Sequence, residues 1–335
     1  MVQNSIFVQK KYPMKYLFLC FLVTFFGINL FSQKTRSIAF YNVENLFDTI
    51  DGINDDAEFL PAGKNNWTSA RYTEKLQHIN KVIQELNKPI FIGMCEIENA
   101  KVVRDVKNYS ANLNNFGLLH YESTDARGID VALLYDSSCL KLAQSGFIRF
   151  ALPGENARTT RDILWGKFAA KKDTIVVMVN HWPSRTGGQE ASEANRLAAA
   201  KNAREFIDSL LRVSPDYKIV FIGDLNDHPT DKAPMLVAEK LVPQIVTSSG
   251  SFGGTYNYKS EWNILDHILV SPGMTNKSCF RRKISLVPNS GKIHSFDYLL
   301  EEYKGQTVPF RTYGGSKYLG GYSDHLPVSI EVSMP

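Results

Sequence analysis

The chain has 335 residues, with 38 lysines and arginines against 34 aspartates and glutamates, a formal net charge of +4. This small basic excess rules out a polycation that holds nucleic acid by bulk phosphate neutralisation. Any contact with a polynucleotide must therefore come from local patches.

The first 32 residues have the pattern of a secretory signal peptide. Lys10, Lys11 and Lys15 precede an uninterrupted apolar stretch, residues 16–31, which is short for a membrane span. We expect an exported protein, periplasmic or secreted, with an uncleaved N-terminal anchor as the alternative. Removing residues 1–32 takes away three lysines and no acid, which leaves 35 basic against 34 acidic residues and a net charge of +1.

Three cysteines remain after that cleavage, Cys95, Cys139 and Cys279. Their odd number and the absence of a CxxC spacing argue against both a disulfide framework and a zinc cluster. No Pro/Ser-rich linker or charge block divides residues 33–335, and we expect this length to form a single domain.

Short apolar runs rich in β-branched residues predict strands along the whole chain. In chain order they are residues 37–42, 89–95, 129–135, 163–169, 174–180, 218–223, 265–270 and 327–332. Apolar residues at three- and four-residue spacing predict helices over 76–86 and 193–211. Residues 272–322, rich in Gly, Ser and aromatic residues, predict loops and short irregular strands, either a surface insertion or a lid that contacts substrate.

Many strands with a few amphipathic helices predict an α+β fold, a four-layer α/β/β/α sandwich of two packed sheets with helices outside. Polar side chains stand at or next to the ends of these strands. They are Asn42, Glu96, His181, Asp224, Asn226, Asp266 and His325. Strands of alternating direction would bring all seven to one rim.

Polar motifs accompany these strands in a fixed order. They are Tyr41-Asn42-Val43-Glu44-Asn45, Gly93-Met94-Cys95-Glu96-Ile97-Glu98-Asn99, Arg127-Gly128-Ile129-Asp130-Val131-Ala132, Asn180-His181-Trp182-Pro183-Ser184, Gly223-Asp224-Leu225-Asn226, Leu265-Asp266-His267-Ile268-Leu269 and Ser323-Asp324-His325. Each motif alone is weak, because Asp and Asn are also favoured in turns. Together, over residues 37–332, they resemble the endonuclease/exonuclease/phosphatase superfamily, which includes pancreatic-type DNases, abasic-site endonucleases, bacterial sphingomyelinases and inositol polyphosphate 5-phosphatases.

The resemblance implies a DNase I-like fold and a metal site. Glu96 matches the family's principal metal carboxylate, Asn42 matches a direct or water-mediated ligand beside it, and Asp324 matches a position that helps to hold metal in some members. Oxygen ligands suit Mg²⁺, with Mn²⁺ as the alternative, whereas the lack of cysteine ligands disfavours zinc.

The resemblance also implies the catalytic residues. Asp224 matches the residue that orients or deprotonates the attacking water, and Asn226 matches the neighbour that positions this water and touches the phosphate. His325 matches the phosphate-contacting imidazole, and Asp266 matches the acid that hydrogen-bonds it. His181 is assigned to phosphate binding and protonation of the leaving group. Because abasic-site endonucleases generally have Tyr at that position, the histidine favours the secreted DNases, sphingomyelinases and phosphatases.

Two arginines are predicted to contact substrate. Arg127 matches a frequent phosphate neighbour of the family, although a surface arginine is nearly as good an interpretation. Arg185 belongs to residues 184–188, which either wrap a phosphate with backbone amides or form a turn before the following helix. Asp130, in the same motif as Arg127, is interpreted equally well as a site residue or as a structural hydrogen-bonding partner.

Residues beside the motifs receive more modest roles. Glu44 and Glu98 are expected to be exposed, and His267 is expected at most to support the site from behind. The aromatic residues Phe310, Tyr313, Tyr318 and Tyr322 have three interpretations: stacking on bases, insertion at a lipid interface, or packing.

We therefore expect an exported Mg²⁺-dependent phosphodiesterase that hydrolyses nucleic acid, DNA or RNA, as a monomer without an obligate protein partner. The alternative is a phosphatase or sphingomyelinase-like enzyme that acts on small or lipid phosphoesters. A binding module that has lost catalysis is the hypothesis from another class, and it is weakened because every main catalytic position holds the expected residue type.

Overall fold

The computed structural model describes Met1 and residues 35–154, 158–171, 173–275 and 283–334. Apart from Met1, the predicted signal peptide, residues 1–32, lies outside the described residues, as does Cys279. The division into a signal peptide and a single domain over residues 33–335 therefore stays a prediction. Among the described helices, none is both long enough and apolar enough to cross a membrane.

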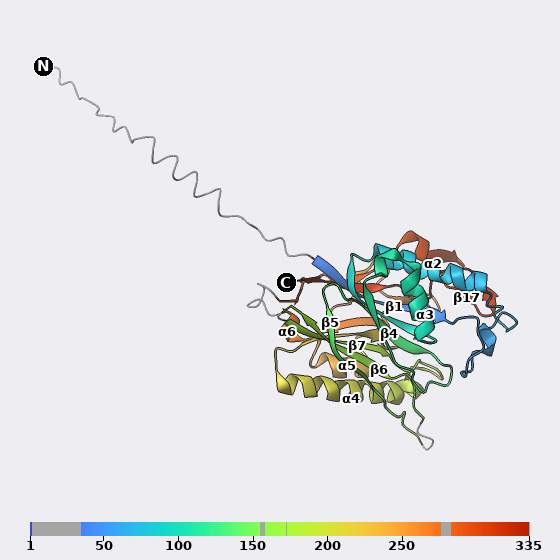
Figure 1. Ribbon diagram of the computed structural model, residues 1–335, viewed down its shortest axis with the longest axis horizontal. Helices are drawn as coiled ribbons and strands as arrows, with labels where there is room; N and C mark the ends of the chain where they lie inside the picture. The colour runs from blue at the N-terminus through green and yellow to red at the C-terminus, as the bar shows by residue number, and fades with distance from the viewer. Residues whose placement is uncertain (2–34, 155–157, 172, 276–282, 335) are drawn as a thin grey trace. The chain divides into compact units, whose positions relative to one another are not determined.

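One mixed sheet joins the first strands of the described chain to the last (Figure 1). Within the described residues its order is β13-β19-β1-β2-β4-β3, and β14 also pairs with β19. Its strands are β1 Thr35–Leu46, β2 Pro89–Ile97, β3 Phe116–His120, β4 Asp130–Asp136, β13 Ser285–Leu286, β14 Lys292–Ile293 and β19 Val328–Ser333. Because β1 and β2 are parallel and β19 is antiparallel to β1, the carboxyl ends of β1 and β2 meet the amino end of β19 at one edge.

The second sheet has the order β5-β6-β7-β8-β12-β9 in the described residues. Its strands are β5 Lys141–Ile148, β6 Ile163–Ala170, β7 Asp173–His181, β8 Lys218–Asp224, β9 Val242–Pro243 and β12 Asp266–Val270. β7 and β8 are parallel, and β12 runs antiparallel to β8. The same rule therefore brings the carboxyl ends of β7 and β8 beside the amino end of β12.

Helices cover the outer faces of the two sheets. α2 Ser69–Glu85 and α3 Ala100–Tyr109 lie on the first sheet, and α4 Gln189–Val213 and α5 Lys232–Ala238 lie on the second (Figure 1). Shorter helical segments are η1 Ala57–Phe59, η2 Ala111–Leu113, η3 Thr247–Ser249, α6 Pro272–Thr275 and η5 Asp297–Leu299. This arrangement confirms the predicted four-layer α/β/β/α sandwich.

The alternation of side chains along β7 explains how the second sheet serves two cores. Ile175, Val177 and Val179 join the buried cluster between the sheets. Val176 and Met178 point to the other face and pack with the α4 alanines. Successive side chains of a strand point to opposite faces, so a continuous apolar run is what a sheet covered on both sides requires.

Three small hairpins lie close in sequence to the amino ends of β12 and β19. They are β10 Tyr256–Tyr258 with β11 Glu261–Asn263, β15 Leu300–Tyr303 with β16 Gln306–Pro309, and β17 Tyr313–Gly314 with β18 Lys317–Tyr318. The short irregular strands predicted within residues 272–322 are thus confirmed for the described part of that range.

His294, just after β14, makes the stability of the fold sensitive to acid. Its side chain is buried, with Nε2 2.8 Å from Ser329 Oγ. Burial, aided by the charge of Lys292, lowers the pKa of His294 to about 4, whereas an unfolded histidine titrates near 6.5. The unfolded chain therefore binds this proton first, and stability is lost as the pH falls from about 6.5 to about 4.

We predict that His294→Gln, which keeps a hydrogen-bonding side chain but cannot titrate, reduces the loss of unfolding free energy between pH 7 and pH 5. Urea unfolding of both proteins at the two pH values measures this difference. An identical loss in the variant and the wild type would contradict the assignment.

Candidate active site

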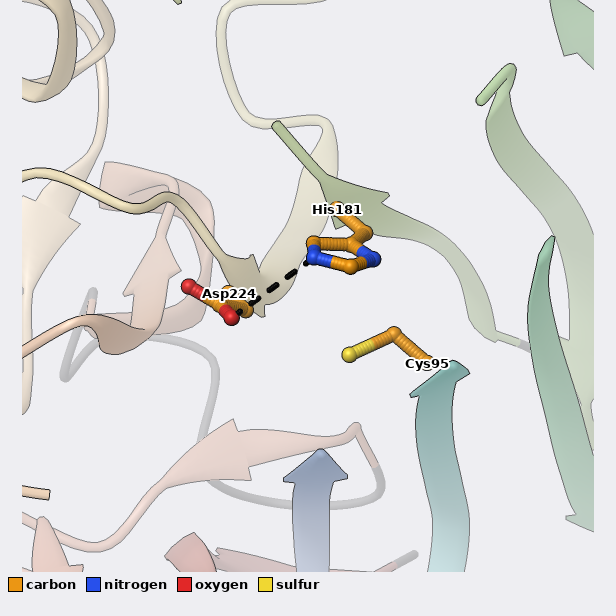
Figure 2. Close-up of side chains that lie close together, drawn as sticks. All are labelled: Cys95, His181 and Asp224. Carbon is orange, nitrogen blue, oxygen red and sulfur yellow. Dashed lines mark ion pairs between the residues drawn. The ribbon is translucent and has the colours of Figure 1, made fainter. Parts of the chain in front are cut away.

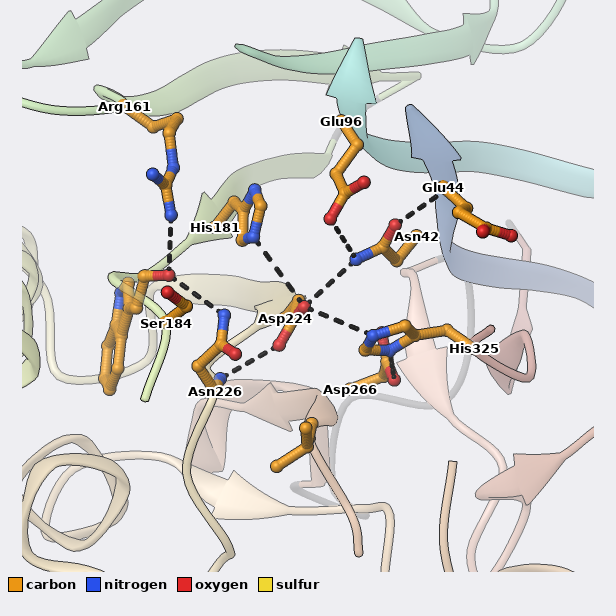
Figure 3. Close-up of polar contacts among 12 residues, drawn as sticks. Asn42, Glu44, Glu96, Arg161, His181, Ser184, Asp224, Asn226, Asp266 and His325 are labelled. Atoms are coloured by element: carbon orange, nitrogen blue, oxygen red, sulfur yellow. Dashed lines mark hydrogen bonds and ion pairs between the residues drawn. The ribbon is translucent and has the colours of Figure 1, made fainter. Parts of the chain in front are cut away.

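Sheet register aligns three of the predicted site residues in one row. His181, the last residue of β7, pairs with Asp224, the last residue of β8, and Asp224 pairs in turn with Asp266, the first residue of β12. Residues directly opposite one another in neighbouring strands project to the same face. The row therefore collects an imidazole and two carboxylates from segments 85 residues apart in sequence (Figure 3).

Gly223 is required for this row because β7 and β8 approach closely beside it. A Cβ atom at residue 223 would lie 2.4 Å from the Asn180 carbonyl oxygen. The Asn180 side chain also donates a hydrogen bond across to the Ile222 carbonyl oxygen, at 3.1 Å. The residue before Asp224 must therefore be glycine, because a larger side chain would clash with the Asn180 backbone.

A β-bulge turns Glu96 toward the row from the first sheet. The register of β2 against β4 shifts between Cys95 and Ile97, and Glu96 has a φ of 61° in the left-handed region. Its Oε2 accepts a hydrogen bond from the Asn45 backbone N–H at 2.9 Å. Bulges commonly redirect a side chain next to an active site, and here the bulge aims a carboxylate at Asn42.

Asp224 lies at the centre of the site and is 1% exposed. Its Oδ1 accepts a hydrogen bond from the Asn226 N–H at 2.9 Å, and its Oδ2 accepts one from Asn42 Nδ2 at 3.0 Å. Nε2 atoms of His181 and His325 each lie 3.8 Å from Oδ2 (Figure 3). Burial raises the pKa of Asp224 to about 7, with His325 opposing and Asp266 adding to the shift. A carboxylate with this pKa suits a general base at neutral pH.

The pKa values of the two histidines are shifted in opposite directions. Burial lowers the pKa of His325, but the charges of Asp266 and Asp224 outweigh it and raise the value well above the ordinary one. His325 Nδ1 lies 2.7 Å from Asp266 Oδ2, which confirms the predicted acid–histidine contact. Burial, and then the charge of Arg161, lowers the pKa of His181 well below its ordinary value. A neutral imidazole keeps one N–H for hydrogen bonding but lacks the second ring proton that a general acid gives up, so the lowered pKa favours phosphate binding over leaving-group protonation for His181.

Asn226 lies in the left-handed region, which asparagine adopts more readily than most residues, and its neighbours fix it there. Its φ is 52°, and its Nδ2 donates to the Trp182 carbonyl oxygen at 3.0 Å. Arg161 donates to that same carbonyl at 2.9 Å (Figure 3). It also pairs with Asp125 at 2.9 Å. The sequence analysis missed Arg161, whose one signal was a basic residue just before a predicted strand.

The donors around Asn42 fit a hard divalent cation. Its Nδ2 bridges the carboxylates of Glu96, at 3.3 Å, and Asp224, at 3.0 Å. Asp266 Oδ1 is buried and has no hydrogen-bond partner. Carboxylate and amide donors are the ligands that Mg²⁺ and Mn²⁺ prefer. The side-chain oxygen of Asn42, Oδ1, accepts the Glu44 N–H at 3.0 Å, so the predicted role of Asn42 as a metal ligand stays a prediction.

Cys95 lies beside His181 and Asp224 (Figure 2). It is completely buried, and burial, with the charges of Asp224 and Glu96, raises the pKa of its thiol well above the ordinary value. Because the thiolate is the form that binds metal, this protonated thiol is a poor ligand. Cys95 therefore fills space beneath the site.

Asp324 and Arg127 stand at the periphery. The half-buried Asp324 carboxylate pairs with Arg311, and the Tyr256 ring lies 4.8 Å from the His325 ring. Arg127 has a 58% exposed side chain with Nε 3.9 Å from Asp125 Oδ1. Metal binding by Asp324 and substrate binding by Arg127 stay predictions.

The expectation that Glu44 and Glu98 are exposed was wrong. Glu44 is 6% exposed and accepts backbone N–H bonds from Thr312, at 2.6 Å, and Tyr313, at 3.3 Å. Glu98 is 3% exposed and accepts the Asp48 N–H at 2.6 Å. Both carboxylates satisfy backbone donors of loops that the motif order does not reveal.

Other neighbours of the motifs have structural partners. His267 Nε2 lies 2.8 Å from the Asp227 carbonyl oxygen, which supports the segment after Asn226 as expected. Asp130 accepts the Ser123 N–H at 3.1 Å. Among the four aromatic residues, Tyr313 packs on Trp67, and Tyr322 stacks on His78 at 4.1 Å, which favours the packing interpretation for these two.

Arg185 is directed at protein atoms. Its Nε donates to the Asn226 carbonyl oxygen at 2.8 Å, and its terminal nitrogen pairs with Asp231 at 3.2 Å. Gly187 and Gly188, both with positive φ, complete a turn that leads into α4. This geometry makes Arg185 a positioning residue for Asn226, and its predicted contact with substrate stays a prediction.

We predict that Arg185→Gln lowers kcat toward bis(p-nitrophenyl) phosphate about 10- to 100-fold with little change in KM, because a small displacement of a catalytic group has that cost. Arg185→Lys should recover part of kcat. The exposed Arg212→Gln on α4 is the matched control. A rise in KM with unchanged kcat would show instead that Arg185 binds substrate.

Solved structures of other proteins share this fold. The chain superposes on an endonuclease/exonuclease/phosphatase family protein from Bacteroides thetaiotaomicron with a TM-score of 0.55 and 16% identity, over 89% of this chain and 98% of that one. A mannosyl-6-phosphatase, Bt3783, from the same species gives 0.56 and 16%, over 89% and 99%. TDP2 from D. rerio, complexed with a single-strand DNA product, gives 0.52 and 15%, over 89% and 99%.

None of the curated proteins matches this sequence. Residues 37–334, which include every residue of the site, match the protein family described as the Endonuclease/Exonuclease/phosphatase family. The chain belongs to the endonuclease/exonuclease/phosphatase family and is a phosphoesterase.

Proposed function

We propose that this phosphoesterase is a metal-dependent phosphodiesterase that hydrolyses nucleic acid. The observation that carries the proposal is the buried Asp224 carboxylate with the Nε2 atoms of His325, whose pKa is raised, and His181, whose pKa is lowered, each 3.8 Å away. The Asp224 carboxylate can accept a proton from water, and the two imidazoles face the same carboxylate oxygen. Attack of water on a phosphoryl group needs such a base together with groups that bind the phosphoryl oxygens.

Glu96 would hold the cation, with Asn42 beside it. When bound, Mg²⁺ or Mn²⁺ supplies charge neutralisation on the phosphoryl and leaving oxygens. The carboxylates of Glu96 and Asp224 on either side of the Asn42 amide support this choice of metal.

The residues of the chain itself support one order of events. Asp224 takes a proton from water as the water oxygen attacks phosphorus, and Asn226, fixed by Trp182 and Arg185, orients that water. His325 offers Nε2–H to a phosphoryl oxygen, while Asp266 holds its Nδ1–H at 2.7 Å. As the new phosphorus–oxygen bond forms, the bond to the leaving group breaks, and the leaving oxygen departs with the electron pair and takes a proton from solvent water.

The balance of charge favours a diester over a monoester. At neutral pH a phosphomonoester carries almost two negative charges, whereas a diester carries one. The guanidinium groups of Arg161, Arg185 and Arg311 are already paired with carboxylates at Asp125, Asp231 and Asp324. The half-buried Tyr256 ring, next to His325, is a surface on which a base can stack.

A phosphatase or sphingomyelinase-like activity on small or lipid phosphoesters is the second candidate. The net charge of +1 after removal of residues 1–32 favours it, because a weakly charged protein gains little from a polyanionic substrate. The likeness to a mannosyl-6-phosphatase shows that the same fold serves such chemistry in another protein.

We predict that the purified protein cleaves plasmid DNA or RNA with Mg²⁺ or Mn²⁺, that EDTA abolishes cleavage, and that Asp224→Asn lowers kcat about 10²- to 10⁴-fold. The exposed Asp216→Asn is the matched control and should retain full activity. Release of phosphate from sugar phosphates, or of phosphocholine from sphingomyelin vesicles, with intact nucleic acid would reject the nuclease and support the second candidate.

We also propose that the protein is exported, on the basis of the lysines and the apolar stretch in residues 1–32. Expression of the full chain in a bacterial host, followed by cell fractionation and mass measurement, should give a processed protein in the periplasm or medium that starts near residue 33. Recovery of the unprocessed chain in the membrane fraction would support an N-terminal anchor instead.

A further inference from the structure

A second group of metal-ligating side chains lies at the junction of β3 and β4. It consists of His120, Glu122 and Asp130, and one donor atom from each lies within 4.8 Å of the others. His120 pairs in register with Ala132, so Asp130 lies diagonally across the strand pair from His120, two residues away on the same face. Glu122, two residues after His120, follows β3 directly.

His120 is the observation that distinguishes this group from an ordinary acidic surface patch. Its side chain is 1% exposed, yet Nε2 makes no hydrogen bond. This nitrogen faces Asp130 Oδ2 at 3.3 Å, and Nδ1 lies 3.7 Å from Glu122 Oε1. A protonated ring would form an ion pair with Asp130 here, whereas a neutral ring leaves the buried nitrogen without a hydrogen bond, and a cation between nitrogen and carboxylate then satisfies both atoms.

The separation of the two buried atoms fits a shared ion. Ligands at about 2.0–2.1 Å from a tetrahedral centre are about 3.3–3.4 Å apart. His120 Nε2 and Asp130 Oδ2 are 3.3 Å apart. The Glu122 side chain is 61% exposed, which gives the ion a path from solvent and leaves that carboxylate able to turn inward.

The surroundings orient these ligands and leave them available. Asp130 uses its other oxygen, Oδ1, to accept the Ser123 N–H at 3.1 Å, which fixes the carboxylate. The nearby Arg149 guanidinium is engaged with both oxygens of Asp162, at 3.1 and 2.8 Å, and reaches only the backbone carbonyl oxygen of Glu122, at 3.4 Å.

We propose that His120, Asp130 and Glu122 form a second cation site, distinct from the one at Glu96, that binds a borderline transition metal such as Zn²⁺ or Co²⁺. One imidazole and two carboxylates form a donor set that suits these ions better than Mg²⁺. The proposal does not depend on which phosphoester the protein hydrolyses.

The consequence of binding is an ordered loop between β3 and β4. This loop carries Asp125, which pairs with the buried Arg161 at 2.9 Å. Arg161 in turn donates to the Trp182 carbonyl oxygen, which also accepts from Asn226. A cation that ties Glu122 to Asp130 therefore stabilises the segment that holds Arg161 against the active site.

The test uses the full chain with Glu96→Gln, so that the predicted catalytic ligand is removed. Titration with Co²⁺, a spectroscopic substitute for Zn²⁺, should give one equivalent of visible d–d absorption, and Zn²⁺ should raise the thermal unfolding temperature. Adding Glu122→Gln should weaken Co²⁺ binding at least about 10-fold, because loss of even an outer partner of a ligand costs that much.

Glu122→Gln changes an exposed side chain and carries little risk to folding, whereas His120→Gln, in the core, is the stronger but riskier variant. The exposed Glu205→Gln on α4 is the matched control and should bind Co²⁺ like the Glu96→Gln parent. Absence of Co²⁺ absorption and of a Zn²⁺ shift in the parent, or equal Co²⁺ affinity with and without Glu122→Gln, would overturn the proposal.

Discussion

The burial of the Asp224 carboxylate is the constraint on which the site depends. A charge removed from water costs several kcal/mol unless hydrogen bonds and opposite charges meet it. Asp224 is met by the Asn226 N–H, by the Asn42 amide and by two imidazoles. Asn42 lies in β1 of the first sheet, and His325 lies just before β19 of the same sheet. His181 is the last residue of β7 in the second sheet. Both sheets must therefore close before the carboxylate is stabilised, and the same contacts hold the fold together and shape the site.

The same arrangement, a buried carboxylate met by hydrogen-bond donors, recurs two residues further along β1, at Glu44. The Glu44 carboxylate accepts the Thr312 N–H, and Lys75 from α2 donates to the Thr312 hydroxyl and, at 2.6 Å, to the Tyr322 carbonyl oxygen. Burial raises the pKa of Glu44 to about 7 and lowers that of Lys75 to about 8. Next in the chain, Ser323 donates to the Asn42 carbonyl oxygen at 2.7 Å. The segment that delivers His325 is thus fixed to β1 and α2 by buried polar groups.

Sequence patterns predicted the central strands and the two long helices, because strands covered on both faces leave continuous apolar runs. They missed β5, an edge strand whose residues are mostly exposed or half-buried, and β3, which is only five residues long. Motif order located Asp224, His181 and His325, since strand ends must meet at a rim. It misjudged Glu44, whose partner Thr312 lies 268 residues away, because a carboxylate that caps a distant loop leaves no local pattern.

The contrast between His181 and His325 shows why residue type alone does not define a role. Both rings face the same Asp224 oxygen at the same distance, 3.8 Å. His325 has Asp266 behind it, so its proton is stabilised, whereas His181 is fully buried on the side of Arg161, so a second positive charge is disfavoured. A phosphoryl group between them meets one cationic and one neutral donor. The environment of the two rings, more than their presence, therefore sets the role that each takes in the proposed reaction.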